Sequence, residues 1–301
     1  MRIAHISDLH VLAMDALRPQ HMFGKRLTGY ANLKLKRTRH HTQERLDRVA
    51  AGLRDLAPDH LVVTGDLTNL ALEAEFERVG FFLRGLGIDA SRITVVPGNH
   101  DAYTQGSYKS QYLPAFLPEF LQADIQVAPH KRVLNTFPFV RLLGSDVALL
   151  ALCSAVPRLP FVAAGQIGAP QLSGVSELLA HPSLSGRKLF VLVHHPLHMP
   201  EKGSKRWFES LRDAAALVGT LTPHAQFVVL HGHLHRRMTH RTDAYVSYGA
   251  TSASNEHHDG ARDAAINVYD LAADGSIDAW AQVWDASGQP ARDTLEHPSV
   301  W

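Results

Sequence analysis

Short apolar runs and amphipathic segments alternate along the first hundred residues. Buried strands typically read as brief apolar runs that end at turn residues, whereas helices place apolar residues three and four positions apart. This pattern predicts strands at 2–7, 61–64 and 93–96, with helices at 42–56 and 71–86 between them. Such a β-α-β-α-β series favours parallel strands joined by helical crossovers.

The pattern changes after Pro97-Gly98, which ends the third strand. A less regular stretch follows, then further strands separated by helices, and finally strands joined by short turns. The expected elements are strands at 147–152, 189–193 and 227–230, helices near 170–179 and 208–221, and strands at 244–248, 264–269 and 277–283. We therefore expect an α/β fold whose core becomes more antiparallel toward the C-terminus.

Aspartate, asparagine and histidine recur just after the predicted strands, where open α/β sheets bind their ligands. The five motifs are Asp8-Leu9-His10, Gly65-Asp66, Gly98-Asn99-His100-Asp101, His194-His195 and His231-Gly232-His233-Leu234-His235. Oxygen and imidazole donors without thiolate suit Mn, Fe or Zn. Because these donors exceed the needs of one ion, the sequence predicts two divalent metal ions that share a carboxylate, roughly 3.5 to 4 Å apart.

These motifs resemble the signature of the calcineurin-like metallophosphoesterase superfamily, which runs D-x-H, G-D, G-N-H-(D/E), H and G-H-x-H. All five blocks occur here in that order. The resemblance implies an α/β fold of four layers, an α-β-β-α sandwich with two mixed sheets flanked by helices. Carried over by position, it implies one metal on Asp8, His10 and His235, a second on Asn99, His194 and His233, and Asp66 as the bridge.

The same resemblance gives two further residues catalytic roles. His100 is expected to face the substrate and to stabilise developing charge or protonate the leaving oxygen, with Asp101 orienting its ring. His195 and His231 are interpreted equally well as residues that support the ligands and as packed core histidines.

The motif string is nearest to bacterial class III cyclic-nucleotide phosphodiesterases. It implies a phosphodiesterase that uses a metal-bridging hydroxide for in-line attack on a cyclic nucleotide or similar diester. The alternative is hydrolysis of a lipid-linked or nucleotide-sugar pyrophosphate at a membrane surface. A non-catalytic binding scaffold is the remote alternative, because the predicted ligands are all present.

Composition places the chain among ordinary globular proteins. Its 301 residues are 45% hydrophobic, enough for a substantial core, and this excludes a disordered chain. The single Cys153 lies in an apolar run and is expected to be buried and inert. We expect a cytoplasmic protein without a signal peptide, and the 20 histidines agree with metal chemistry.

The near-neutral charge conceals one basic segment. Residues 16–43 carry seven basic residues and no acid, whereas the whole chain has 30 basic and 29 acidic residues. Three interpretations stay open: a cap that binds phosphate, peripheral membrane contact through 18–41, and a solvated helix face. No nucleic-acid partner is expected.

The domain organisation is expected to be simple. We predict one domain over 1–285 with the basic insertion inside it. The tail 286–301 would pack either on its own core or on a second copy in a homo-oligomer. The polar segment 252–263 is expected to be a long loop that gates the site or only connects surface elements.

Overall fold

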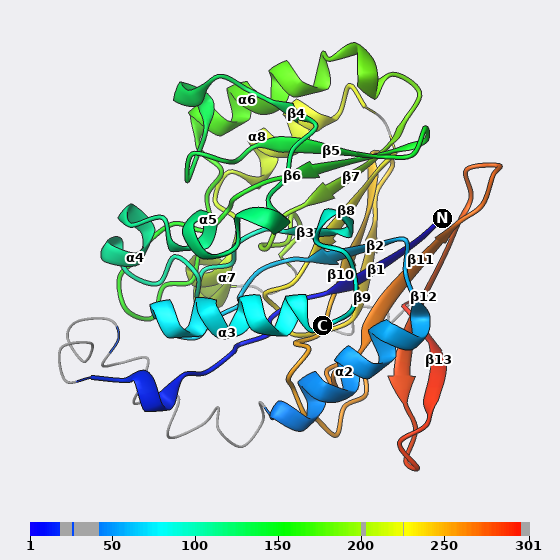
Figure 1. Cartoon of the computed structure of the whole chain (residues 1–301). Coiled ribbons are helices and arrows are strands. Elements are labelled where there is room, and N and C mark those ends of the chain that lie inside the picture. The colour runs from blue at the N-terminus through cyan, green and yellow to red at the C-terminus, as the bar shows by residue number, and fades with distance from the viewer. Residues whose placement is uncertain (19–25, 27–41, 200–202, 225, 296–301) are drawn as a thin grey trace.

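The computed structural model of the chain describes residues 1–18, 26, 42–199, 203–224 and 226–295 (Figure 1). Within these residues two β-sheets pack face to face, and helices cover the outer face of each sheet. The predicted four-layer α-β-β-α sandwich is confirmed.

The first sheet has the strand order β13-β12-β11-β1-β2-β3. Strands β1, β2 and β3 are parallel, and β11, β12 and β13 join them as antiparallel neighbours. The two predicted crossover helices are α2 and α3. The bounds are β1 Arg2–Ile6, α2 Gln43–Leu56, β2 His60–Val63, α3 Glu73–Arg84, β3 Ile93–Val95, β11 Ile266–Leu271, β12 Ile277–Trp284 and β13 Pro290–Thr294.

The second sheet has the order β4-β5-β6-β7-β8-β10-β9. Strands β6, β7, β8 and β10 are parallel, whereas β4, β5 and β9 make antiparallel pairs. The bounds are α4 Gln105–Lys109, α5 Tyr112–Phe116, β4 Ile125–Gln126, β5 Phe139–Leu143, β6 Val147–Ala151, α6 Ala169–Leu179, β7 Lys188–Leu192, α7 Gly203–Glu209, α8 Ala214–Leu221, β8 Phe227–His231, β9 Met238–Arg241 and β10 Tyr245–Gly249. Short 3₁₀ turns lie at Met14–Ala16, Ala90–Arg92, Pro118–Phe120, Pro129–Lys131 and Pro182–Leu184.

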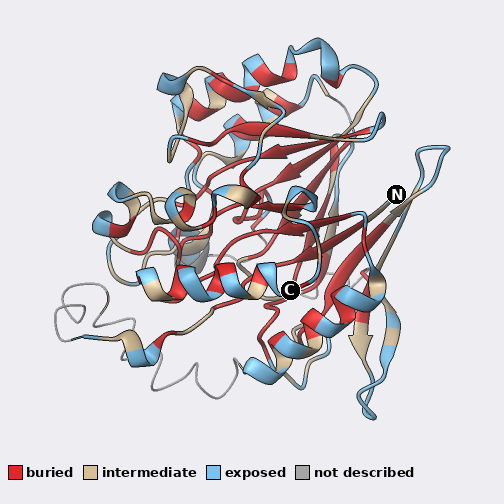
Figure 2. Ribbon diagram, in the orientation of Figure 1, coloured by how far each residue is buried: buried red, intermediate tan, exposed pale blue. Residues whose placement is uncertain are grey.

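The central strands β6, β7 and β8 of the second sheet are buried on both faces, so they read as continuous apolar runs rather than alternating ones. In β7, Phe190 and Leu192 enter the core between the sheets, whereas Val191 packs toward α6 and α8. Figure 2 shows the resulting layer of buried strands beneath half-exposed helices. Each such fully buried side chain contributes about 1.5–3 kcal/mol to stability.

The helix predicted at 208–221 is two helices, which corrects the sequence interpretation. Residues between α7 and α8 pair with the loop before α6, where the backbone N–H of Gly165 donates to Ser210. The Asp213 carboxylate accepts from the backbone N–H groups of Ile167 and Gly168 at 2.9 and 2.8 Å. These tertiary contacts interrupt a segment whose apolar spacing alone predicts one helix.

The predicted tail boundary at residue 285 divides a hairpin. Residues 290–294 form β13, the edge strand of the first sheet, which pairs with β12. Because this strand lies at the sheet edge, it shows exposed and half-buried residues without an apolar run. Strands β4, β5 and β9 were likewise not predicted. In the described part of the chain, no helix is long and apolar enough to span a bilayer.

One buried histidine away from the motifs makes stability depend on pH. The Nε2 atom of His60 lies 2.8 Å from the Thr94 hydroxyl. Burial, aided by the charges of Arg141 and Arg92, lowers the pKa of His60 to about 3. Between pH 6.5 and 3 the unfolded chain binds this proton and the folded chain does not.

We therefore expect the His60 contribution to stability to be complete above pH 6.5 and lost as pH falls. In denaturant titrations from pH 7 to pH 5, His60→Gln should reduce the slope of unfolding free energy against pH, by an amount that grows as pH falls and approaches about 1.4 kcal/mol per unit near pH 5. His130→Gln, at an exposed position, is the control. An unchanged slope in the His60 variant would contradict the assignment.

Candidate metal centre

Five loops meet where the parallel strands β1, β2, β3, β7 and β8 end (Figure 1). Backbone hydrogen bonds join neighbouring loops of the same sheet. The N–H of Asp8 donates to Gly65 at 2.9 Å, and that of His10 donates to Asp66 at 3.0 Å. The N–H of Gly232 donates to His194 at 3.1 Å, which ties the loops of the second sheet together.

The first group of donors comprises Asp8, His10 and His235. The Nε2 atom of His235 lies 3.1 Å from Nε2 of His10 and 3.1 Å from Oδ1 of Asp8. This Oδ1 atom is buried and accepts no hydrogen bond from the described residues. A carboxylate oxygen and two imidazole nitrogens that converge in this way fit a divalent cation.

The second group comprises Asp66, His194 and His233. The Nε2 atom of His194 lies 3.4 Å from Oδ2 of Asp66 and 3.2 Å from Oδ1 of Asn99. Asp66 also belongs to a group with His10 and His100. Its carboxylate therefore stands between the two sets of imidazoles, as a bridging ligand would.

Backbone carbonyls determine which ring nitrogen faces the site. The Nδ1–H of His194 donates to Thr64 at 2.7 Å, so Nε2 is left for a metal. The Nε2–H of His233 donates to the Glu209 carbonyl at 3.0 Å, so Nδ1 is left. Such outer hydrogen bonds orient ligand rings and raise their basicity.

Most of these residues have an uncommon backbone conformation. Asp8, His10, Asp66, His233 and His235 have φ angles of 53°, 48°, 48°, 69° and 48°. Positive φ is unusual for residues other than glycine, and strained residues of this kind cluster at functional sites. The bent backbone turns side chains from different strands toward one point.

Burial and neighbouring charges shift the pKa values of the site residues in opposite directions. Burial by itself would raise the pKa of Asp66, but the imidazoles of His194, His100 and His10 hold this pKa well below its usual value. Burial would lower the pKa of His194, yet Asp66 and Asp8 raise it to about 9. A divalent cation would replace that proton on binding.

His100 lies beside the donors, but Asp101 does not orient its ring, which corrects the sequence expectation. The Nδ1–H of His100 donates to the Asn69 carbonyl at 2.7 Å, and the ring stacks on Tyr103 with centroids 5.3 Å apart. Asp101 instead accepts from the backbone N–H groups of Leu67, Thr68 and Gly98. Its carboxylate holds two motif loops together, because buried N–H groups require an acceptor.

His195 and His231 pack around the centre. Both ring nitrogens of His195 are satisfied, by the Ser154 hydroxyl at 2.7 Å and the Ala163 carbonyl at 2.8 Å. His231 is buried with Nδ1 3.1 Å from the Gly232 carbonyl. The free Cys153 is buried as expected.

Sequence reasoning missed Asn69. Its carbonyl accepts from His100, and its side-chain amide donates to the carbonyl of His10. Asn69 thus connects the D-x-H loop with the candidate proton donor. Backbone carbonyls carry no sequence signal, so only its position three residues after Asp66 hinted at this role.

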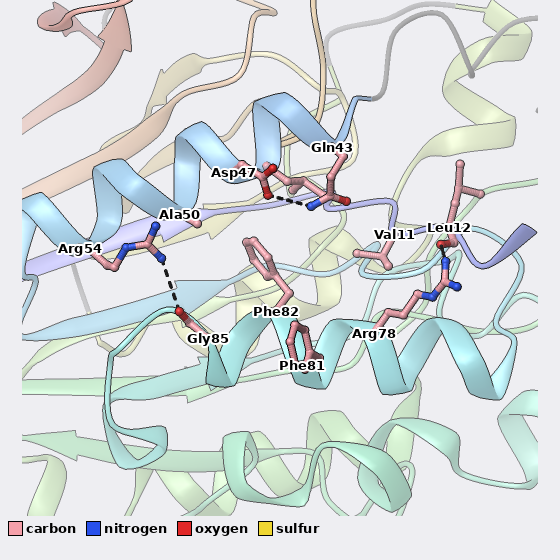
Figure 3. Close-up of a pocket in the computed structure, with 11 residues that line it drawn as sticks. Val11, Leu12, Gln43, Asp47, Ala50, Arg54, Arg78, Phe81, Phe82 and Gly85 are labelled. Carbon is pink, nitrogen blue, oxygen red and sulfur yellow. Dashed lines mark hydrogen bonds between the residues drawn. The ribbon is translucent and has the colours of Figure 1, made fainter.

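Two of the pockets in the described part of the chain are considered as the substrate cavity. Figure 3 shows one of about 390 Å³ between α2 and α3, and none of the candidate ligands lines it. A larger one, of about 890 Å³, is lined by Tyr103, Arg158, Trp207 and Arg212 among others. None of the candidate ligands lines the larger pocket either, but Tyr103 of its lining stacks on His100, so this pocket adjoins the candidate proton donor.

The basic segment lies mainly outside the described residues, which include its Arg18 and Arg26 but not 19–25 or 27–41. Arg26 donates to the carbonyls of Leu70 and Ala71 at 3.0 and 2.7 Å. It therefore contacts the loop that follows Asp66. The start of the polar segment 252–263 also touches the centre, where the Ser252 hydroxyl donates to the Asp8 carbonyl at 2.6 Å.

The close approach of loops at Gly232 gives a prediction. A Cβ atom there would collide with the side chains of Ser7 and Asp8. We expect Gly232→Ala to displace Asp8 and to reduce metal affinity at least about 10-fold, measured by calorimetric titration with Mn²⁺. Gly219→Ala, which meets nothing within 4 Å in α8, is the control. Equal metal affinity in both variants would show that the close packing of Gly232 against Asp8 does not affect metal binding.

The comparisons agree with this geometry. Residues 1–237 match the family model described as calcineurin-like phosphoesterase. No curated protein sequence matches the chain.

Two solved structures share the fold at low identity. A dimetal phosphatase from Danio rerio is 13% identical with a TM-score of 0.60, over 98% of this chain and 99% of that one. The purple acid phosphatase PPD1 from yellow lupin (Lupinus luteus) seeds is 12% identical with a TM-score of 0.56, over 97% of this chain and 53% of that one. With these folds and the donor groups at the strand ends, the chain belongs to the calcineurin-like phosphoesterases, a family of metal-dependent phosphoric ester hydrolases.

Proposed function

We propose that this protein is a dinuclear metal-dependent phosphodiesterase whose substrate is a cyclic nucleotide or a similar diester. The observation that carries the proposal is the position of His100 beside two groups of metal donors. A proton donor matters most where the leaving group is a poor one, as in an alkyl diester.

Two groups of donor residues support the proposal of two cations. Asp8, His10 and His235 would hold one, Asn99, His194 and His233 would hold the other, and Asp66 would serve both. When bound, such a pair supplies a nucleophile near neutral pH and neutralises charge on the phosphoryl group. The nitrogen and oxygen donors suit Mn, Fe or Zn.

His100 is arranged to give up a proton from Nε2. Its Nδ1–H is committed to the Asn69 carbonyl, which fixes the ring orientation. Its backbone N–H donates to Oδ1 of Asp66 at 2.7 Å, which holds the backbone of His100 beside the candidate bridging carboxylate. Tyr103 supports the other side of the ring.

Removal of the shared carboxylate tests the two-metal proposal. We expect Asp66→Asn to lose bound metal and to lower kcat/KM at least about 100-fold, since even partners of metal ligands contribute 10- to 100-fold. Metal content by mass spectrometry and hydrolysis of bis(p-nitrophenyl) phosphate are the two measurements. Asp55→Asn, exposed on α2, is the control. A metal-loaded, active Asp66 variant would overturn the dinuclear assignment.

The leaving group tests the role of His100. For a diester with an alkoxide leaving group, His100→Asn should lower kcat about 100-fold or more. A p-nitrophenolate leaving group needs little protonation, so the same variant should lose far less activity on that substrate. Steady-state kinetics with both diesters decide the point. Equal losses would mean that His100 is not the proton donor, and turnover of monoesters alone would exclude the phosphodiesterase.

A further inference from the structure

Exposed apolar side chains gather beside the metal centre. Seven large apolar residues are exposed in the described part of the chain, and four of them lie on two neighbouring segments. Their side chains are exposed by 77% at Leu159, 85% at Phe161, 61% at Trp207 and 39% at Phe208. A concentration of this kind marks a binding surface rather than ordinary surface composition.

Backbone pairing joins the two segments into one surface. The N–H of Ala163 donates to Phe208 at 2.8 Å, and the N–H of Arg212 donates to Gly165 at 3.1 Å. These hydrogen bonds hold the two segments beside each other. We call Leu159, Phe161, Trp207 and Phe208 the apolar rim.

The apolar rim adjoins the reaction site on two sides. The segment of Phe208 continues into Glu209, whose carbonyl orients His233, and the segment of Phe161 continues into Ala163, whose carbonyl orients His195. Leu159, Trp207 and Phe208 also line the pocket of about 890 Å³ that Tyr103 connects to His100. A ligand held at the metal centre can therefore extend onto the apolar rim.

The charge of this pocket favours an anion with an apolar extension. Arg158 and Arg212 line it, and none of the described residues lining it is acidic. The nearby Asp213 carboxylate already accepts backbone N–H groups of Ile167 and Gly168. The Arg212 guanidinium lies 4.5 Å above the Trp207 ring, so a cation and an apolar face are presented together.

We propose that the phosphate ester cleaved here carries a long alkyl chain, which binds across the pocket and the apolar rim. This inference rests on the proposed phosphodiesterase function, and among the diesters named there it favours an alkyl diester over a cyclic nucleotide. Trp207 and Tyr103 alone would suffice for a stacked base. Leu159 and Phe161 extend the apolar surface further. Because Phe161 lies outside the pocket lining, the apolar surface continues beyond the pocket, as binding of a ligand longer than the pocket requires.

The test compares two diesters with the same leaving group. Methyl p-nitrophenyl phosphate and dodecyl p-nitrophenyl phosphate differ only in the alkyl chain, and both are assayed as monomers. Each buried methylene is worth about fourfold in affinity, so kcat/KM of the wild-type enzyme should be at least about 100-fold higher for the dodecyl ester.

Substitutions test whether the apolar rim causes the preference for the dodecyl ester. In Leu159→Ser/Phe161→Ser/Trp207→Ser, this ratio should fall at least about 10-fold. The control is Phe81→Ser, because Phe81 is 80% exposed on α3 and lies outside the apolar rim; it should keep the wild-type ratio. A wild-type ratio near one, or a triple variant with an unchanged ratio, would overturn the inference.

Two further outcomes separate this inference from the proposed function. If the enzyme hydrolyses neither diester, the phosphodiesterase fails, and calorimetric binding of dodecyl phosphate against methyl phosphate decides the inference. Equal binding of the two would overturn it, whereas tighter dodecyl binding that the triple variant loses would support it. A nucleoside p-nitrophenyl diester gives the last outcome. If its kcat/KM exceeds that of the methyl ester by as much as the dodecyl ester's does, and the triple variant loses this advantage, the pocket binds a base and the alkyl-chain inference is wrong.

Discussion

The structure depends on holding buried ligand atoms against one another before any cation arrives. The Nε2 atoms of His10 and His235 lie 3.1 Å apart, and His194 lies 3.4 Å from a carboxylate oxygen of Asp66. Burial disfavours such charged and polar groups unless they are paired. The surrounding fold must therefore hold these side chains in place. Both the strained turns and the backbone hydrogen bonds between loops restrict their positions.

The two sheets provide this rigidity together. The D-x-H and G-D loops extend from the first sheet, and the histidine loops extend from the second. The shared core between the sheets fixes the distance between the two sets. Glycines make the final approach possible, since a Cβ atom at Gly98 would collide with Asp66 and one at Gly232 with Asp8. Packing of the whole domain thus determines distances within the centre.

The reaction side of the centre is built differently from the metal side. His100 is oriented by a carbonyl of Asn69 and by stacking on Tyr103, rather than by a neighbouring carboxylate. The loop before α6 orients His195 and the last residue of α7 orients His233, in both cases through a backbone carbonyl. The same loop, α7 and the residues just after α7 present the apolar rim and Arg212. Orientation of the histidines and the exposed apolar surface therefore reside in the same segments.

The sequence by itself determined the class of fold and the chemistry of the centre. Apolar periodicity predicted the central strands, because a strand buried on both faces must be apolar throughout. Motif identity named the donors, because metal ligands require particular atoms. The edge strands β4, β9 and β13 escaped prediction, since edge strands carry weak patterns, and the interior strand β5 was also not predicted. The break between α7 and α8, the Asn69 carbonyl, the true partners of Asp101 and the apolar rim were decided by tertiary structure, because each depends on backbone groups or on segments distant in sequence.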